Sequence, residues 1–193
     1  MATSGDDTLY YMKIEKTSLE GVLLLKPEPL RDGKGEIFED MRGIFLETYS
    51  EAKYKEQGIN IHFVEDDISV SKKNVLRGMH GDDRTWKLIS CAYGKIFFVA
   101  LNGDKKSGTF GKWESFDLND ENRWRILVPP MYGSGYLALT DKAIVQYKQS
   151  EHYRPGGQFT YKWSDPRFNI PWPVKNPVLT TRDAEAPCVV DVT

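Results

Sequence analysis

From residue 62 to residue 149 the chain is a succession of short segments that favour strands, each bounded by residues that favour turns. Such segments are expected at 62–64, 68–71, 75–79, 86–93, 95–102, 111–117, 124–128, 135–139 and 143–149. They carry aromatic and β-branched residues, and turn sequences such as Asn102-Gly103-Asp104 lie between them. Many short strands, spaced about 8–12 residues apart, are typical of an antiparallel sandwich or barrel. The sequence therefore predicts a mainly β fold.

The residues before this succession are more varied. The apolar run 22–25 ends at prolines and is expected to be a buried strand, and the polar stretch 31–41 is expected to be a loop. Strand character returns at 43–49. Residues 50–58 predict the one clear short helix, with Ser50 as its N-cap and Gly58 at its end.

Length and composition favour one domain. A chain of 193 residues can form a single domain over 1–193, with a disordered lead at 1–10 and an extended, proline-rich C-terminal segment at 155–193. The net charge of −2 provides no basic surface for nucleic acid. No apolar run reaches 18 residues, so no membrane span is expected. Cys91 and Cys188 are expected to be free thiols in a reducing cytoplasm.

The stretch Val75-Leu76-Arg77-Gly78-Met79-His80-Gly81-Asp82, followed by Lys87, carries the most chemistry. It places an imidazole, whose ordinary pKa of about 6.5 suits proton transfer, close to two cations that suit an anionic ligand. A solvated charge cluster on a hairpin would have the same composition. Strict strand alternation would put Arg77 and His80 on opposite faces, so both can point inward only if Gly78 permits a bulge.

Four further places can contribute to a site. Arg42 and Glu47 flank Phe45, Tyr147 lies on an alternating strand, Asp165 precedes a proline, and Ser134 lies in a proline-led, glycine-rich turn. Each has an ordinary structural interpretation, as an edge strand, a core tyrosine, a turn aspartate and a plain turn.

A metal site of the kind found in many barrels needs two or three histidine or cysteine ligands with a carboxylate. His80 has no histidine two residues away, and His62 and His152 are isolated. We therefore expect no metal and no other cofactor.

Taken in order, these segments resemble the dTDP-4-dehydrorhamnose 3,5-epimerase family. The pattern is Arg-Gly-x-Phe-x-Glu, Leu-Arg-Gly-x-His, Lys-Leu, a proline-led glycine turn, Tyr-Lys, Trp-x-Asp-Pro and Trp-Pro, from about residue 21 to residue 183. The stretches 77–82 and 158–163 look more like a branch that handles GDP-6-deoxy-4-keto-heptoses. The resemblance implies a cupin-type antiparallel β-barrel (jelly roll), usually a homodimer, that epimerises an NDP-4-keto-6-deoxysugar for deoxysugar or surface-polysaccharide biosynthesis.

The resemblance also implies roles for residues in catalysis. His80 would be the base that removes a proton next to the 4-keto group, and Asp165 would orient its ring. Tyr147 would return the proton on the opposite face, and Lys87 would stabilise the enolate oxygen. Arg77 would hold the diphosphate.

Other residues are implied in nucleotide binding. Arg42, Phe45 and Glu47 lie where the family contacts the nucleotide, in part across the dimer interface. Glu65 and Asp67 stand where the family commonly has Gln-x-Asn. The expected base is therefore either guanine, whose N1–H and amino group suit carboxylates, or thymine. Ser134 stands where the family often has a histidine.

Several alternatives remain at this point. Inversion at C3 and C5 is only slightly favoured over inversion at C3 alone. A 3,4-ketoisomerase of the same barrel type, a non-catalytic sugar-nucleotide or glycan-binding barrel, and a metal-dependent oxygenase are the rivals. The absence of a ligand cluster in the sequence disfavours the last.

Overall fold

The computed structural model describes residues 11–30 and 35–189. The expected disordered lead at 1–10 therefore falls on residues that are not described. Thirteen strands and three short helices are present in the described part. The strands are β1 (Met12–Lys16), β2 (Leu23–Pro27), β3 (Ile37–Asp40), β4 (Gly43–Leu46), β5 (Glu65–Lys72), β6 (Leu76–Asp82), β7 (Lys87–Tyr93), β8 (Lys95–Asn102), β9 (Trp113–Asn119), β10 (Arg125–Val128), β11 (Tyr132–Ala138), β12 (Lys142–Gln149) and β13 (Gln158–Thr160). The helices are α1 (Glu51–Glu56), α2 (Thr181–Ala184) and a 3-10 turn at Pro155–Gly157.

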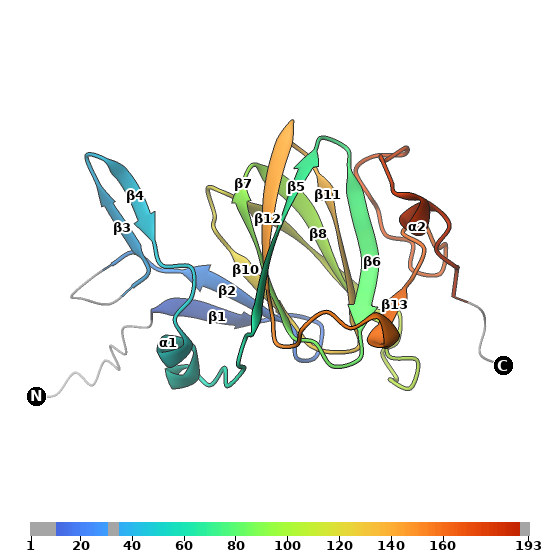
Figure 1. Cartoon of the computed structure of the whole chain (residues 1–193), viewed down its shortest axis with the longest axis horizontal. Coiled ribbons are helices and arrows are strands. Elements are labelled where there is room, and N and C mark those ends of the chain that lie inside the picture. The colour runs from blue at the N-terminus through green and yellow to red at the C-terminus, as the bar shows by residue number, and fades with distance from the viewer. Residues whose placement is uncertain (1–10, 31–34, 190–193) are drawn as a thin grey trace, which may run out of the picture.

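Two antiparallel sheets form the body of the molecule (Figure 1). One has six strands in the order β1-β2-β10-β7-β12-β5, and the other has five in the order β13-β6-β11-β8-β9. Neighbours in space are mostly distant in sequence, as in a jelly roll. The mainly β, cupin-type antiparallel barrel expected from the sequence is confirmed.

Successive residues of a strand point to opposite faces of its sheet, and the buried apolar side chains form three separate cores. The largest lies between the two sheets and includes Ile89, Phe98 and Ile126. Leu88 and Leu127, each next to one of these residues in sequence, point the other way and pack with Tyr54 of α1 on the outer face of the six-stranded sheet. A third core covers the outer face of the five-stranded sheet with aromatic residues of the C-terminal segment. Strand alternation thus leaves both sheets covered on both faces over much of their area.

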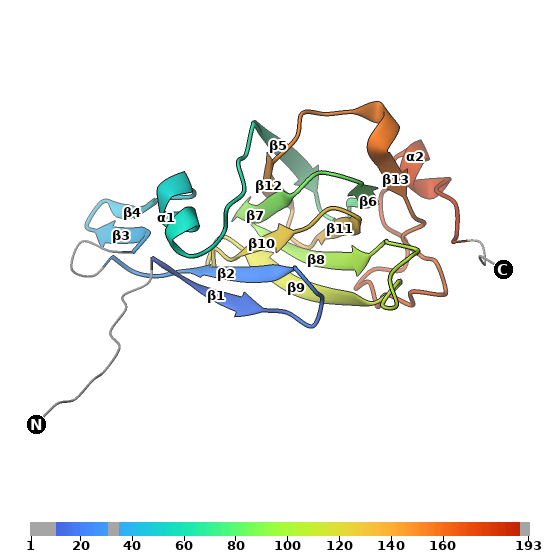
Figure 2. The ribbon, with the colours of Figure 1, turned by 90° about the horizontal axis from the view of Figure 1, so that it is seen from below.

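The β3–β4 hairpin projects away from the barrel, at the end of the molecule opposite α2 (Figures 1 and 2). A buried ion pair anchors its base: Arg125 Nη1 donates to Glu36 Oε2 at 2.9 Å and to the Tyr54 hydroxyl at 3.1 Å. Arg125 Nη2 donates to the carbonyl of Glu47 at 2.9 Å. One guanidinium therefore ties β10 to α1 and to both ends of the hairpin.

Several local predictions are confirmed and some are wrong. The helix expected at 50–58 is α1, although the Ser50 side chain makes no capping hydrogen bond. Within the loop expected at 31–41, residues 37–40 form β3, and residues 62–64 form no strand. β1 and β13 were not predicted. β1 forms because its residues find a partner in β2, and short strands of this kind depend on tertiary pairing more than on propensity.

The sequence predicted free thiols and no membrane-spanning segment. Cys91 is a buried free thiol and Cys188 an exposed one, as predicted. Within residues 11–30 and 35–189, no helix has the length and apolar character needed to cross a membrane.

Candidate active site

A cavity of about 370 Å³ opens between the two sheets at the end nearest α2. Arg77 and His80 reach it from β6 of the five-stranded sheet, and Lys87 and Tyr147 reach it from β7 and β12 of the six-stranded sheet. The remaining side chains of its wall include Asp67, Ser134, Gln149, Thr180, Arg182 and Asp183. The sequence-predicted residues His80, Tyr147, Lys87, Arg77, Asp67 and Ser134 are therefore brought together in one place.

A bulge in β6 lets Arg77 and His80 share this cavity. Ser134 of β11 pairs with His80, and Tyr136 pairs with Arg77, so two residues of β6 lie opposite Gly135 alone. Gly78, one of these two, has a φ of +139°, and a Cβ there would lie 2.5 Å from the Cα of Gly135. Only glycine fits that conformation and that approach. The predicted bulge at Gly78 is confirmed.

The carboxylate that contacts His80 belongs to Asp183, and the assignment of Asp165 to this position is wrong. Nε2 of His80 lies 2.6 Å from Oδ1 of Asp183. The Asp165 carboxylate accepts backbone hydrogen bonds from Arg167 at 2.9 Å and from Val189 at 2.6 Å. Asp165 is buried and fixes the C-terminal segment, which is a structural role.

Asp183 is held by a short helix that sequence reasoning missed. Thr180 caps α2, and its hydroxyl accepts a hydrogen bond from the amide of Asp183. Burial by itself raises the pKa of Asp183, but the hydrogen bonds from His80 and Thr180 and the nearby imidazole lower it overall. The carboxylate is therefore ionised beside His80. The Thr-x-x-Asp spacing of Thr180 and Asp183 is a helix-capping signal that could have identified this segment.

Tyr147 lies on the wall opposite His80. The two side chains come from different sheets and line the same cavity. Desolvation raises the pKa of Tyr147 far above its ordinary value, so its hydroxyl holds its proton throughout the neutral range. Nearby, the Tyr136 hydroxyl is within 2.8 Å of Ser69 Oγ and 2.9 Å of Ser71 Oγ.

Three cations line the cavity. Arg77 Nε donates to Ser71 Oγ at 3.1 Å, and Arg182, which the sequence analysis missed, donates to Thr160 Oγ1 at 3.0 Å. Burial lowers the pKa of Lys87, and the charge of Arg182 adds to this effect, whereas Asp82 opposes it. The three charges suit an anionic ligand.

Carboxylates occupy the part of the rim formed by β5. Gln149 Nε2 donates to Glu65 Oε1 at 3.0 Å and to Asp67 Oδ2 at 2.6 Å. Glu65 also accepts the backbone amide of Tyr153 at 3.3 Å. Asp67 lines the cavity, and Glu65 reaches it through Gln149. Hydrogen-bond acceptors therefore dominate this side of the entrance.

The structure does not bring Arg42, Phe45 or Glu47 to the cavity of their own chain. All three belong to the β3–β4 hairpin or its end. Arg42 pairs with Asp40, Glu47 pairs with Lys53 at 2.8 Å, and Phe45 is 72% exposed.

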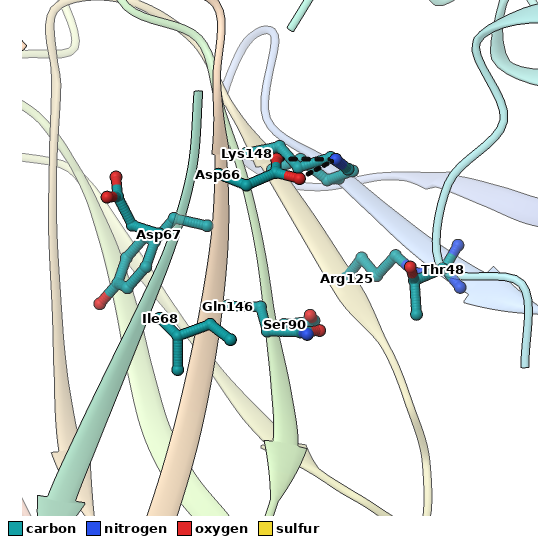
Figure 3. A pocket seen from close by; sticks show the side chains of 10 residues that line it. Thr48, Asp66, Asp67, Ile68, Ser90, Arg125, Gln146 and Lys148 are labelled. Atoms are coloured by element: carbon teal, nitrogen blue, oxygen red, sulfur yellow. Dashed lines mark hydrogen bonds and ion pairs between the residues drawn. The ribbon is translucent and has the colours of Figure 1, made fainter. Parts of the chain in front are cut away.

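A second cavity of about 140 Å³ lies on the outer face of the six-stranded sheet. Figure 3 shows it, with the Asp66–Lys148 ion pair at its edge and Thr48 and Arg125 across from Ile68. Neither His80 nor Asp183 lines it. Asp67 and Tyr147 line both cavities, whereas His80 and Asp183 line only the cavity between the sheets.

In the described part of the chain, no three His, Cys, Asp or Glu side chains converge as a metal centre would require. The cavity between the sheets is lined by a histidine paired with a buried carboxylate, by a protonated tyrosine from the other sheet and by three cations. This arrangement suits proton abstraction next to a carbonyl group.

Comparison with known proteins agrees with this chemistry. Residues 16–191 match the family described as dTDP-4-dehydrorhamnose 3,5-epimerase. A dTDP-4-dehydrorhamnose 3,5-epimerase from Methanothermobacter thermautotrophicus is 39% identical over 162 residues, which cover 83% of each chain. The fold and the cavity define an antiparallel-barrel isomerase. The chain belongs to the dTDP-4-dehydrorhamnose 3,5-epimerase family and is an epimerase.

Two solved structures add detail. A dTDP-6-deoxy-D-glucose-3,5-epimerase from Legionella pneumophila, in complex with dTDP-4-keto-L-rhamnose, superposes with a TM-score of 0.83 at 32% identity and covers 92% of each chain. A 3'-monoepimerase from Streptomyces bikiniensis, in complex with dTDP-quinovose, has a TM-score of 0.80 at 27% identity, with 89% of this chain and 85% of that chain covered.

Proposed function

We propose that the protein inverts one or both carbons next to the keto group of an NDP-4-keto-6-deoxysugar. The observation that carries this proposal is the placement of the His80–Asp183 pair and Tyr147 on opposite walls of one cavity. A 4-keto group acidifies the protons on C3 and C5. Inversion requires removal of such a proton from one face and its return on the other, and this placement of a base and an acid provides for both.

His80 is the base in this proposal. The ionised Asp183 accepts the N–H at Nε2, which fixes the ring in the tautomer that leaves the lone pair on Nδ1. That nitrogen takes the proton from the sugar, and Asp183 stabilises the imidazolium that forms. Tyr147 then donates its proton to the opposite face of the planar enolate.

The cations stabilise the anionic groups of the substrate and of the intermediate. Lys87 lies on the same sheet wall as Tyr147 and is close enough to the cavity to stabilise the enolate oxygen. Arg77 and Arg182 bind the diphosphate, because a guanidinium matches phosphate oxygens with two parallel hydrogen bonds. Ser134, which pairs with His80 across the sheet, contacts the sugar.

Incubation with 4-keto-6-deoxysugar nucleotides in deuterated water tests the proposal directly. Double inversion predicts deuterium at both C3 and C5, and single inversion predicts it at C3 alone. Both outcomes suit this fold, because a 3,5-epimerase from Legionella pneumophila and a 3'-monoepimerase from Streptomyces bikiniensis share it. Migration of the keto group would indicate a 3,4-ketoisomerase, and binding without exchange would indicate a non-catalytic barrel. Either result would contradict the proposal.

Two features bear on which nucleotide the substrate carries. The dTDP ligand of the Legionella relative supports a dTDP-sugar, whereas the carboxylates of Glu65 and Asp67 support a GDP-sugar, because guanine offers N1–H and an amino group side by side. Calorimetric titration with GDP and dTDP separates the two. If the carboxylates recognise guanine, a Glu65→Gln and Asp67→Asn double variant loses its preference for GDP, and Asp66→Asn, paired with Lys148, keeps it.

We also propose a homodimer in which the β3–β4 hairpin of each subunit reaches the site of the other. Phe45 and Met41 leave the hairpin apolar and exposed, and β5, an open sheet edge, carries Ile68 at 64% and Val70 at 57% exposure. Exposed apolar edges of this kind need cover. A fully active monomer by sedimentation at micromolar concentration would contradict the proposal. A Phe45→Ser variant that dimerises less well or binds the nucleotide less tightly would support it.

The cellular setting follows from the substrate. We propose that the enzyme works in the cytoplasm, because a doubly charged nucleotide sugar does not cross a membrane unaided, and that its product enters deoxysugar synthesis for capsular polysaccharide or lipopolysaccharide. Cell fractionation and the sugar composition of a deletion strain test these two statements.

A further inference from the structure

Lys87 occupies an unusual position for a charged side chain. It is the first residue of β7 and lines the substrate cavity together with His80 and Tyr147. It also lines a third, much smaller cavity of about 20 Å³, and Asp82 forms part of the wall of that cavity. Within the described part of the chain, the Lys87 ammonium makes no hydrogen bond or ion pair. The charge of Lys87 must therefore be stabilised from a greater distance.

Asp82 also lines the small cavity, and hydrogen bonds hold its carboxylate in place. It is the last residue of β6 and is only 6% exposed. One carboxylate oxygen, Oδ1, accepts hydrogen bonds from the amides of Arg84 and Thr85 at 2.9 and 3.1 Å and from the Thr85 hydroxyl at 2.8 Å. The other oxygen, Oδ2, takes part in none of these bonds. A space of this size can hold about one water molecule, and both Asp82 and Lys87 line it.

The charges around Lys87 act in opposite directions. Burial disfavours its charged form, and so does the positive charge of Arg182 on α2. Asp82 is the carboxylate whose charge opposes them. Burial by itself raises the pKa of Asp82, but its hydrogen bonds and the charge of Lys87 lower it overall, so Asp82 is ionised at neutral pH. The other titratable groups that line the two cavities are Asp67, Arg77, His80, Tyr136, Tyr147, Glu151, His152, Tyr153, Arg154 and Asp183.

We propose that Asp82 is a positioning residue that keeps Lys87 protonated and directed toward the substrate cavity. Asp82 touches no reacting atom and acts through Lys87. An uncharged lysine would have no positive charge to offer the enolate oxygen, so the reaction depends on a carboxylate outside the cavity. This inference rests on the proposed function, in which Lys87 stabilises that oxygen.

The test compares two neighbouring neutral variants. Asp82→Asn keeps an oxygen for the amides of Arg84 and Thr85 and removes the charge. Asp83→Asn, one residue further on, removes the same charge from an exposed side chain that pairs with Arg154. We expect the rate of Asp82→Asn relative to Asp83→Asn to fall by about threefold or more from pH 7 to pH 9, since each unit above a midpoint lowers the protonated fraction tenfold. Asp82→Glu should restore the wild-type profile.

A second readout does not depend on activity. The Lys87 Cε resonance, assigned with Lys87→Met, is followed by NMR against pH, and its midpoint should lie lower in Asp82→Asn than in Asp83→Asn. Identical midpoints would overturn the inference. If Asp82→Asn does not fold, Asp82→Ser carries the same test, because a serine oxygen can accept the same amides. A wild-type protein without exchange on any 4-keto sugar would contradict the proposed function, and the NMR result would still decide the relation between Asp82 and Lys87.

Discussion

The side chains of His80 and Asp183 meet at 2.6 Å although 103 residues separate them in the chain. One comes from the bulged strand β6, and the other from the short helix α2 near the end of the described chain. The imidazole is about one-third exposed, whereas the carboxylate is 2% exposed. The ring is therefore anchored from the protein side and open on the cavity side, so the packing of the C-terminal segment determines the direction in which the imidazole points.

Asp183→Asn should lower deuterium exchange at the sugar by about 10²-fold or more. The asparagine can present its NH₂ group, in place of a carboxylate oxygen, to Nε2 of His80, and this selects the imidazole tautomer whose proton is on Nδ1. The same change should weaken the acid dependence of stability. A carboxylate with a lowered pKa stabilises the fold above its unfolded pKa, and this contribution is lost as the pH falls through the folded value. Exchange kinetics, and unfolding by urea at pH 7 and pH 3, measure the two effects.

Asp165→Asn provides the matched control. It should leave exchange nearly intact and reduce the free energy of unfolding by about 1–3 kcal/mol, because its carboxylate accepts buried backbone amides. If Asp165→Asn lost exchange while Asp183→Asn kept it, the assignment of the pair would be reversed.

His80→Asn should abolish exchange, with a loss on the order of 10²–10⁴-fold or more. The side chain of asparagine fits the available space but has no basic nitrogen. The circular dichroism spectrum and the thermal midpoint of the variant should stay close to those of the wild type, since the imidazole is partly exposed. His62→Asn, an exposed histidine near α1, serves as the control. Near-wild-type exchange in His80→Asn would refute its role as the base.

The barrel could be predicted from the sequence because its strands are short, apolar and separated by turn residues. Segment 95–102 coincides with β8, and most of the neighbouring strands differ by only a few residues at each end. Three of the five residues at 12–16 are charged, and this short segment forms a strand where it pairs with β2. Local preference thus identified the central strands and the edge strands β5 and β9, whereas it missed the edge strands β1 and β13, which depend on tertiary pairing.

The site was predictable to the extent that its residues share a strand motif. His80, Arg77 and Lys87 lie within eleven positions, and the need for a bulge at Gly78 followed from strand alternation. Asp183 could not be assigned in this way, because the fold alone brings it to His80. The conspicuous Trp-x-Asp-Pro motif led to the assignment of Asp165 as the partner of His80, but its carboxylate accepts hydrogen bonds from nearby backbone amides. Sequence position is a poor guide to contact for an irregular segment.

Gly78→Ala should destabilise the protein by about 2–3 kcal/mol and reduce exchange, because the new Cβ would meet the backbone of Gly135 and Ser134 at 2.5 and 2.9 Å. Gly58→Ala is the control for backbone conformation alone. It also has a positive φ, of +84°, but nothing lies within 4 Å of the added carbon, so its cost should be only about 1 kcal/mol. Equal costs by urea unfolding would show that the close approach at the bulge is unimportant.

Exhaustive chelation should leave the exchange rate unchanged. The proposed mechanism uses a base, an acid and fixed cations, and the sequence supplies no histidine or cysteine pair with ligand spacing. Activity is measured after dialysis against a strong chelator, and again after each divalent metal is added. Loss of activity that one particular metal restores would move the protein to a metal-dependent class.

Tyr147→Phe should separate the two carbons. The phenylalanine ring fills the same space against the core between the sheets, so folding should change little. In the proposed mechanism, however, the hydroxyl supplies the proton to the face opposite His80, so its loss should slow that step by about 10²–10⁴-fold. If the hydroxyl serves C5, the variant loses the C5-inverted product, and exchange at C3 through His80 persists. Tyr161→Phe is the control, because that hydroxyl donates to the carbonyl of Gly103 away from the cavity. NMR of the products in deuterated water decides the result: a Tyr147→Phe enzyme that still forms the doubly inverted sugar at the wild-type rate would exclude Tyr147 as the acid.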